Sequence, residues 1–395
     1  MGFWDVLESI KSCFWDDSPQ TENTQEESHA KSYDEVGIEA FRSDNWKQMD
    51  DDEKIESLQQ LSDENSAEIG LSNPPTVVQG SEGCGSYDHS TNTIEVNLTE
   101  CSNPYEAVDT VIHEDNHAYQ YEAVESTLKN GSRYSEGETA VLSAERPGAG
   151  YISDGEEYDL QSFELDSNNA GFQYVTDHCS GMTDDPAYFD YVNGRDNHFQ
   201  YVNAGLSNTD AVNAQETGQV NDAYRSGAIS EAEANQANEA IVYGNTSFRA
   251  ATEESGEIAH QECIDASITK SKQLHNDFEN GTTVQAEDRQ TCIGYMQEGL
   301  AQSQEELNSL KAEQNEYICS NNMGFREVAT DEKCLEFRSK IDECEQQVDQ
   351  YKFHITELST DAELSQQGGL SQSSQGLASG LGESAGSEMD NGLSM

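Results

Sequence analysis

Two histidines four residues apart, with a glutamate directly after the first, form the pattern His113-Glu114-x-x-His117. On a helix, residues four apart lie on one face, so both imidazoles can direct a ring nitrogen at one metal ion. Glu114 projects from the flank of that pair, where it can accept a proton from a metal-activated water. Chance would supply roughly 0.02 such pentapeptides in this composition. The spacing therefore predicts a zinc site with Glu114 as the catalytic base.

A catalytic zinc site needs a third protein ligand and an open fourth position. The best candidate for that ligand is Glu164 in the downstream segment QSFELDSNN, and the alternatives are Asp166, Glu157 and His178. Asn168, one helical turn after Glu164, could hydrogen-bond a metal ligand. Imidazole and carboxylate donors together suit Zn²⁺, which is the cofactor we expect.

Peptide hydrolysis also needs a hydrogen-bond donor for the oxyanion that forms on the substrate carbonyl. Tyr158, Tyr119 and His178 are the candidates. We select Tyr158 as the second catalytic residue and expect Tyr119 to be a packing residue.

The histidine motif lies inside a segment whose sequence marks both ends of a helix. Asn103 can act as the N-cap, Pro104 as the first helical residue and Glu106 as the partner in a capping box. The Lys-Asn-Gly run at 129–131 is a C-terminal stop signal. We therefore predict a single helix over residues 104–130.

Short strands are predicted before that helix, at 76–78 (TVV) and within a hairpin over 83–98. The last part of the hairpin, TIEVNL at 93–98, alternates apolar and polar residues. A zincin cleft needs a strand beside which an extended peptide can be added. We expect TIEVNL to be that strand.

Residues 40–180 resemble a small gluzincin-like metallopeptidase domain of the type found in bacterial toxin and effector-like proteins. The most specific part is HEDNHAYQ at 113–120, which is similar to HE-x-R-H-A-Y-Q in that family. A downstream QSFELD at 161–166 resembles a Q-P-x-E-x-D-A element. The resemblance implies zinc ligands at His113, His117 and Glu164, with Glu114 as the general base.

The sequence departs from the family pattern at two positions. Asn116 stands where arginine is common, which implies the loss of a charged group beside the site. Ser162 stands where proline is common. Neither change removes an implied zinc ligand or the base.

The chain carries 20 Lys and Arg against 77 Asp and Glu, a formal net charge of −57. Such a surface repels nucleic acid and anionic membranes, which need basic patches. The acids are spread through every segment, which favours solubility in a high-salt interior. No segment approaches the ~18 apolar residues of a membrane span, and a secretory signal is not evident. We expect a cytoplasmic protein, with non-classical secretion as the alternative.

The nine cysteines are scattered and form no CxxC pair. A zinc ribbon or a local redox motif is therefore not indicated. We expect most of them to be reduced and to act as small, half-buried apolar residues.

The expected fold class is α+β: a minimal zincin core, with a small sheet and an active-site helix, followed by a mainly α-helical C-terminal region. Heptad spacing at 293–317 and 337–358 predicts a coiled-coil-like helical hairpin, or a pair of coils for self-association or a partner. The predicted segments are an amphipathic N-terminal helix (1–15), a disordered acidic linker (16–35), a metallopeptidase domain (36–205), a helical region (206–284), the heptad hairpin (285–362) and a disordered tail (363–395).

These features predict a zinc-dependent metallopeptidase that hydrolyses a protein or peptide substrate, as an effector or toxin. The alternative is a helical coiled-coil interaction or scaffold protein with a catalytically inert zincin core.

Overall fold

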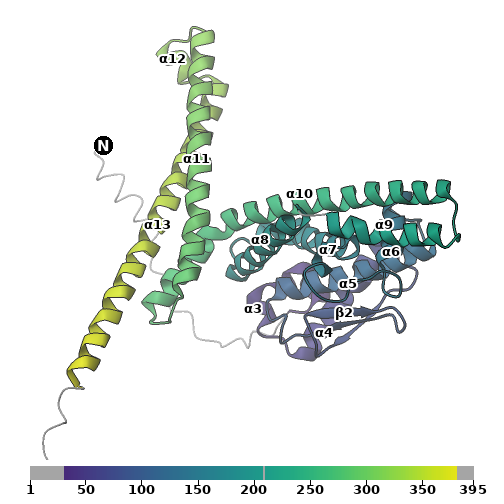
Figure 1. Ribbon diagram of the computed structural model, residues 1–395. Coiled ribbons are helices and arrows are strands. Elements are labelled where there is room, and N and C mark those ends of the chain that lie inside the picture. The colour runs from purple at the N-terminus through teal and green to yellow at the C-terminus, as the bar shows by residue number, and fades with distance from the viewer. Residues whose placement is uncertain (1–30, 208–209, 380–395) are drawn as a thin grey trace, which may run out of the picture.

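The computed structural model describes residues 31–207 and 210–379 (Figure 1). The amphipathic helix expected at 1–15 lies outside the described residues, as does most of the linker expected at 16–35. The described chain is mainly helical and contains one small mixed sheet, which confirms the expected α+β class. None of its helices in these two ranges is long and apolar enough to cross a membrane.

The elements of the site-bearing part follow one another from residue 33 to residue 206. They are α2 (Tyr33–Val36), η1 (Gly37–Phe41), α3 (Ser43–Trp46), α4 (Asp51–Ile69), β1 (Thr76–Gln79), β2 (Gly85–Asp88), β3 (Thr93–Val96), α5 (Pro104–Glu125), α6 (Glu136–Glu145), η2 (Tyr158–Leu160), α7 (Ser162–Cys179), η3 (Ser180–Met182) and α8 (Pro186–Leu206). The remaining helices are α9 (Asp210–Arg225), α10 (Glu231–Glu279), α11 (Ala286–Ser320), α12 (Phe325–Val328) and α13 (Glu332–Ser379).

The sheet has the order β1-β3-β2, with β1 parallel and β2 antiparallel to β3. The expectation that TIEVNL borders the cleft is therefore wrong, because β3 is paired on both sides and cannot accept an added strand. The edge strand beside the motif-bearing helix α5 is β2. Its first residue, Gly85, lies so close to α5 that an added Cβ would be 2.3 Å from Thr110 Cγ2. A larger residue at this position would have to displace the Thr110 side chain.

The motif-bearing helix α5 begins as predicted and ends earlier than predicted. Asn103 Oδ1 accepts a hydrogen bond from the Tyr105 amide, and Pro104 is the first helical residue. The helix ends at Glu125 rather than at residue 130, because Ser126 adopts a left-handed conformation (φ 59°). The Thr127 amide then bonds back to the Glu122 carbonyl oxygen and closes the helix end.

Helix α5 is buried on several sides, which fixes its rotation about its own axis. Val108 and Val111 are fully buried in the main core together with Leu58 of α4. A buried carboxylate, Asp115, accepts hydrogen bonds from side chains of α4, at 2.7 Å from Ser62 Oγ and 2.9 Å from Asn65 Nδ2. Burial of this many faces leaves His113 and Glu114 directed toward the remaining open side, where the cavity described below lies.

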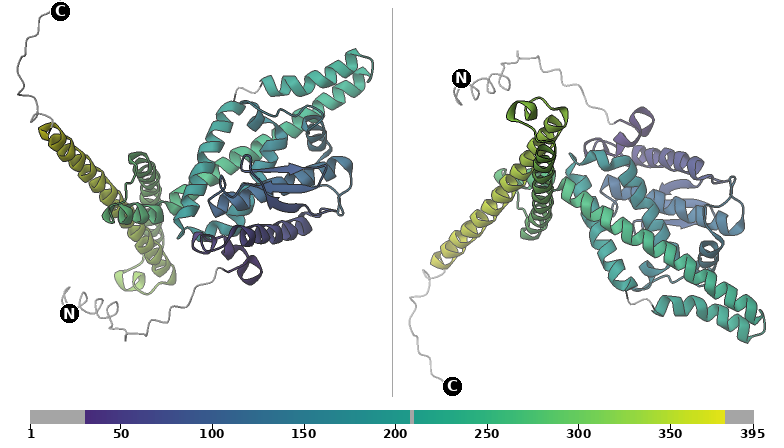
Figure 2. Two further views of the ribbon diagram at one scale, coloured as in Figure 1. Left: turned by 90° about the horizontal axis from the view of Figure 1, so that it is seen from below. Right: turned by 90° about the horizontal axis from the view of Figure 1, so that it is seen from above.

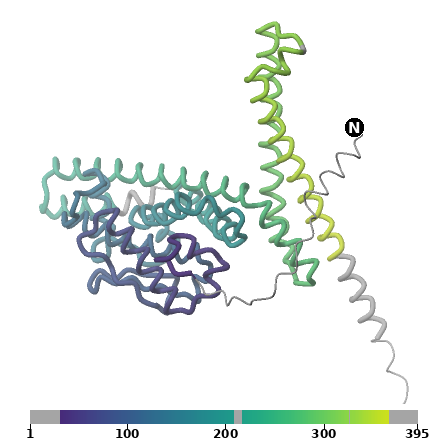
Figure 3. The backbone as a smooth tube through the Cα atoms, turned by 180° about the vertical axis from the view of Figure 1, so that it is seen from behind, coloured from purple at the N-terminus to yellow at the C-terminus, as the bar shows by residue number. Residues whose placement is uncertain are grey.

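Helix α10 is 49 residues long and joins the site-bearing part to the hairpin of α11 and α13 (Figures 1 and 3). Near its middle, Thr252 Oγ1 accepts a hydrogen bond of 3.0 Å from Asn169 Nδ2 of α7. Toward its C-terminal end, Lys270 forms an ion pair of 2.7 Å with Asp190 of α8. Seen from below and from above, α10 lies on the side of the site-bearing part that is opposite to α4 (Figure 2).

Helices α11 and α13 pack against each other in opposite directions, which confirms the predicted antiparallel hairpin. Lys311 of α11 pairs with Glu345 of α13 at 2.7 Å, and Tyr317 faces Phe337 at 6.3 Å between ring centroids. The buried seam contains heptad positions of both helices: Leu307, Ile341, Cys344 and Val348. Helix α13 continues to Ser379, beyond residue 362, where the sequence predicts that the ordered region ends.

Asp185, at the N-cap of α8, connects three parts of the fold. Its carboxylate is buried and accepts hydrogen bonds from the amide and hydroxyl of Ser43, from Tyr105 Oη of α5 and from the Ala187 amide, all between 2.7 and 3.0 Å. We expect Asp185→Ala to lower the free energy of unfolding by about 3 kcal/mol, because several buried donors lose their acceptor. Denaturant unfolding measures this loss.

The adjacent Asp184 is the matched control. Its side chain is 71% exposed and pairs with Arg42 at 2.8 Å, so Asp184→Ala should cost no more than about 0.5 kcal/mol. Burial raises the pKa of Asp185, but the hydrogen bonds from Ser43 outweigh burial and hold that pKa below its usual value. The contribution of Asp185 is therefore present at neutral pH and lost as the pH falls through its folded-state pKa. Equal losses for both variants at neutral pH would contradict the assignment.

Candidate metal centre

The structure brings together the three residues predicted as metal ligands. His113 and His117 come from successive turns of α5, and Glu164 comes from the first turn of α7. His113 Nε2 lies 3.3 Å from one carboxylate oxygen of Glu164, and His117 Nε2 lies 3.5 Å from the other. The three ligand atoms lie within 4.8 Å of one another. In residues 31–207 and 210–379, no other group of His, Cys, Asp and Glu is arranged in this way.

The ring of His117 is held in one orientation by Gln120, one turn further along α5. Gln120 Nε2 donates to the Phe163 carbonyl oxygen and to Asp166 Oδ2, both at 2.9 Å. Its amide oxygen therefore faces His117 Nδ1, at 2.9 Å, and accepts the proton of that nitrogen. His117 Nε2 therefore faces Glu164 and is the nitrogen that would bind a metal after losing its proton.

Glu164 has the environment expected of a carboxylate that binds a cation. Its side chain is fully buried, and its Oε2 has no hydrogen-bond donor. Its Oε1 accepts a hydrogen bond of 2.8 Å from Tyr151 Oη. An uncompensated buried oxygen costs free energy, and a metal ion between the two histidines and Glu164 would compensate it. The donor set and this orphaned oxygen together fit a Zn²⁺ ion.

Glu164 and His117 also shift each other's pKa. Burial favours neutral His117, but the charge of Glu164 and its hydrogen bond outweigh burial and raise the pKa of His117 to about 9. Burial likewise opposes ionisation of Glu164, and the two histidines outweigh it and hold the pKa of Glu164 well below its usual value. The metal-free centre is therefore an ion pair, and metal binding releases a proton from it.

A cavity of about 540 Å³ is lined by two of the three candidate ligands, His113 and Glu164. Glu114 lies in its wall and is only 7% exposed, and burial, opposed by both histidines, raises the pKa of its carboxyl group. Tyr158 lines the same cavity, as do Gly83 to Gly85 at the start of β2. Glu114 and Tyr158 thus both border the cavity that His113 and Glu164 line.

Asp166 does not belong to the group that could hold a metal ion. Its Oδ2 accepts hydrogen bonds from Gln120, from Asn116 Nδ2 at 2.7 Å and from Tyr134 Oη. The ExD spacing of Glu164 and Asp166 therefore places one carboxylate at the metal position and the other against the residues that hold His117.

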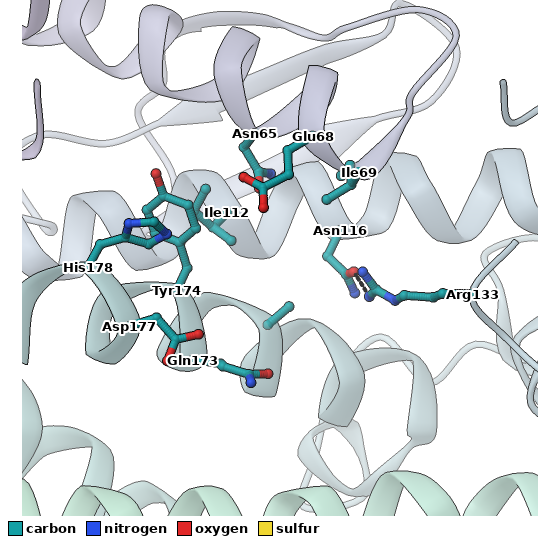
Figure 4. Close-up of a pocket in the computed structure, with 11 residues that line it drawn as sticks. Asn65, Glu68, Ile69, Ile112, Asn116, Arg133, Gln173, Tyr174, Asp177 and His178 are labelled. Carbon is teal, nitrogen blue, oxygen red and sulfur yellow. Dashed lines mark hydrogen bonds between the residues drawn. The ribbon is translucent and has the colours of Figure 1, made fainter. Parts of the chain in front are cut away.

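The charge expected to be missing at Asn116 is supplied by a different part of the chain. The guanidinium of Arg133, in the loop before α6, donates to Asn116 Oδ1 and lies 3.6 Å from Asp166 Oδ2 (Figure 4). It also lies over the ring of Tyr119, 4.5 Å from the centroid. An arginine from outside the motif therefore places a positive charge beside Asn116 and Asp166.

The remaining candidates from the sequence lie elsewhere. His178 lies against Tyr174, with the two rings tilted and their centroids 4.2 Å apart, in a separate pocket that contains none of the three candidate ligands (Figure 4). Glu157 is exposed and does not belong to the metal-binding group. Tyr119 is buried, and its hydroxyl oxygen accepts a hydrogen bond from the Arg133 amide, as expected of a packing residue.

Three residues in or near the cavity were not identified from the sequence. Tyr151 is the donor to Glu164, from a loop with no recognisable signal. Arg195 of α8 pairs with Asp109 at 2.5 Å and donates to Asn168 Oδ1, so Asn168 contacts this arginine rather than a metal ligand. His198, one turn after Arg195, also lines the cavity. A half-buried arginine is conspicuous in a chain with only 20 Lys and Arg residues, but the partners of Arg195 could not be inferred from spacing.

A site of this geometry fits a zincin-like metal centre. No family model, curated protein or solved structure matches this chain. The site must therefore be interpreted from its own chemistry.

Proposed function

We propose that this protein is a zinc-dependent metallopeptidase of gluzincin-like type. The observation that carries the proposal is the convergence of His113, His117 and the buried, partly unpartnered Glu164 beside a cavity that also contains Glu114. Two imidazoles and one carboxylate are the ligand set of catalytic zinc sites that keep one position open.

When bound, zinc supplies a Lewis acid that polarises a peptide carbonyl and acidifies water. Glu114 holds the proton taken from the attacking water and delivers it to the leaving amine. Tyr158 donates a hydrogen bond to the carbonyl oxygen as negative charge develops on it. Gln120 and Asp166 keep His117 in the required tautomer throughout.

The substrate we propose is an extended segment of a peptide or protein, which lies along the edge strand β2. Support comes from residues 83–85, which line the same cavity as His113 and Glu164, so a chain paired with β2 would border that cavity. The role as an effector or toxin rests on the family resemblance, and a high-salt working environment rests on the net charge of −57.

The direct test is metal analysis of the purified full-length protein, combined with hydrolysis of a mixed peptide library. The proposal predicts about one zinc per chain and cleavage that chelation abolishes and added zinc restores. Protein that takes up no zinc, or zinc-loaded protein that cleaves no peptide in the library, would contradict it.

Gln120→Ala tests the support of His117. Without the acceptor at Nδ1, the ring loses its fixed tautomer and orientation, so zinc affinity should fall by about 10- to 100-fold. Competition with a chromogenic chelator measures the affinity. Gln59→Ala, on α4 and remote from the metal ligands, is the control and should leave the affinity unchanged. A wild-type affinity in Gln120→Ala would show that His117 needs no such support.

A further inference from the structure

Two cysteines that are 17 positions apart in the sequence meet at the wall of the metal cavity. Cys84 precedes β2, is exposed and lines the cavity. Cys101 follows β3 and is fully buried beneath it. Cys101 Sγ lies 3.6 Å from the Cys84 carbonyl oxygen, to which its thiol donates a hydrogen bond. Neither is part of the proposed metal site.

The backbone holds this pair in place from both sides of the hairpin. The Asn97 amide donates to the Cys84 carbonyl oxygen at 2.8 Å, which continues the pairing of β2 with β3 by one residue. The Cys101 amide in turn donates to the Asn97 carbonyl oxygen at 2.9 Å. The turn after β3 thus returns Cys101 under Cys84. The contact is a product of the sheet register and not of a flexible loop.

The two thiols differ in the way that a nucleophile and a resolving cysteine differ. The hydrogen bond from Cys101, opposed by burial, lowers the pKa of Cys84 to about 7. The hydrogen bond to Cys84 and burial both raise the pKa of Cys101. Cys101 Sγ also lies 3.4 Å from Thr110 Oγ1 of α5. One thiol is therefore accessible and reactive, and the other is protected.

We propose that Cys84 and Cys101 are a thiol–disulfide exchange site that reacts with low-molecular-weight disulfides. The Cys84 thiolate attacks one sulfur of the small disulfide, forms a mixed disulfide and releases the first small thiol. Cys101 then gives up its proton and attacks Cys84 Sγ. This forms the Cys84–Cys101 bond and releases the second small thiol. One small disulfide is reduced to two thiols, and two protein thiols are oxidised to one disulfide.

The bond would join the two ends of the hairpin at the cavity wall. It would take Cys101 Sγ away from Thr110, which lies one turn before His113 on α5 and also lines the cavity. The oxidised and reduced proteins would therefore present different surfaces at the start of β2. The inference does not rest on the proposed peptidase activity, because the reaction requires only the two cysteines.

The test treats the reduced, folded, full-length protein with glutathione disulfide and follows it by intact mass and peptide mapping after alkylation. The wild-type chain should lose two hydrogens and yield a linked peptide containing Cys84 and Cys101, with no stable adduct on either. At neutral pH a thiol with the pKa of Cys84 should react about fivefold faster than an ordinary exposed thiol. Cys319 of α11, also exposed, is the internal reference.

Three variants distinguish the role of Cys84 as the nucleophile from the role of Cys101 as the resolving cysteine. Cys101→Ser should stop at a stable glutathione adduct on Cys84, and Cys84→Ser should leave Cys101 reduced. Cys319→Ser should behave as the wild type at the pair. A wild-type chain that keeps both thiols, or that accumulates the adduct on Cys84 without forming the internal bond, would overturn the proposal. The wild-type result alone tests the proposal, even if a variant fails to fold.

Discussion

Glu114→Gln should lower the rate of peptide hydrolysis by about 10²- to 10⁴-fold while zinc remains bound at about one ion per chain. The amide has nearly the shape of the carboxylate, but it cannot accept the proton of the attacking water. Because Glu114 is not one of the three ligand residues, its replacement leaves the donor set intact. Initial rates on the best library peptide, measured beside the zinc content of the same sample, separate loss of chemistry from loss of metal.

Glu125→Gln is the matched control, because it makes the same change at the exposed C-terminal end of the same helix. Its rate and zinc content should equal those of the wild type. If Glu114→Gln keeps full biological activity, the alternative interpretation gains support: a helical interaction protein whose zincin core is catalytically inert.

Glu164→Gln should weaken zinc binding by more than about 100-fold, since loss of a direct ligand should exceed the 10- to 100-fold effect of a residue that only supports one. The carboxylate oxygens of Glu164 face both histidines, at 3.3 and 3.5 Å, so no other described side chain has an equivalent position. Isothermal titration of the metal-free variant with zinc measures the affinity directly.

Asp166→Asn makes the same chemical change two residues later. Asp166 hydrogen-bonds Gln120 and Asn116 and does not face the histidines, so zinc affinity should fall by only about 10- to 100-fold. A larger loss in Asp166→Asn than in Glu164→Gln would reverse the assignment of ligand and support. Circular dichroism of both variants excludes a general loss of fold as the cause.

Local signals predicted the beginning of the active-site helix but not its end. Asn103 and Pro104 are a cap and a first-turn residue that act within a few residues, so their effect is readable from sequence. The end at Ser126 depends on a left-handed backbone conformation of that serine, which residue preferences do not predict. Helix α6 was missed, although Ser135 and Glu138 form a capping box that marks its start.

The candidate site was predictable where its residues follow helical spacing and not where they meet through tertiary contacts. His113 and His117 lie one turn apart on one helix, so their convergence follows from geometry. Arg133 and Arg195 reach the site from a loop and from α8, and only the packing of α5 against α7 and α8 determines which groups they meet. The same reason explains why β3, rather than β2, was assigned to the cleft: the order of strands is not encoded in their alternation.

Under the proposed function, the short edge strand β2 limits which substrates can bind. Strand β2 has four residues, which at roughly 3.3 Å each span about 13 Å. A substrate paired with β2 would therefore form hydrogen bonds with only a few main-chain groups. The paired segment of the substrate must be fully extended over that length. Helices and tight turns cannot meet this requirement. Cleavage would fall in unfolded or loosely attached segments, so the conformation of a target protein would select the cut as much as its side chains do.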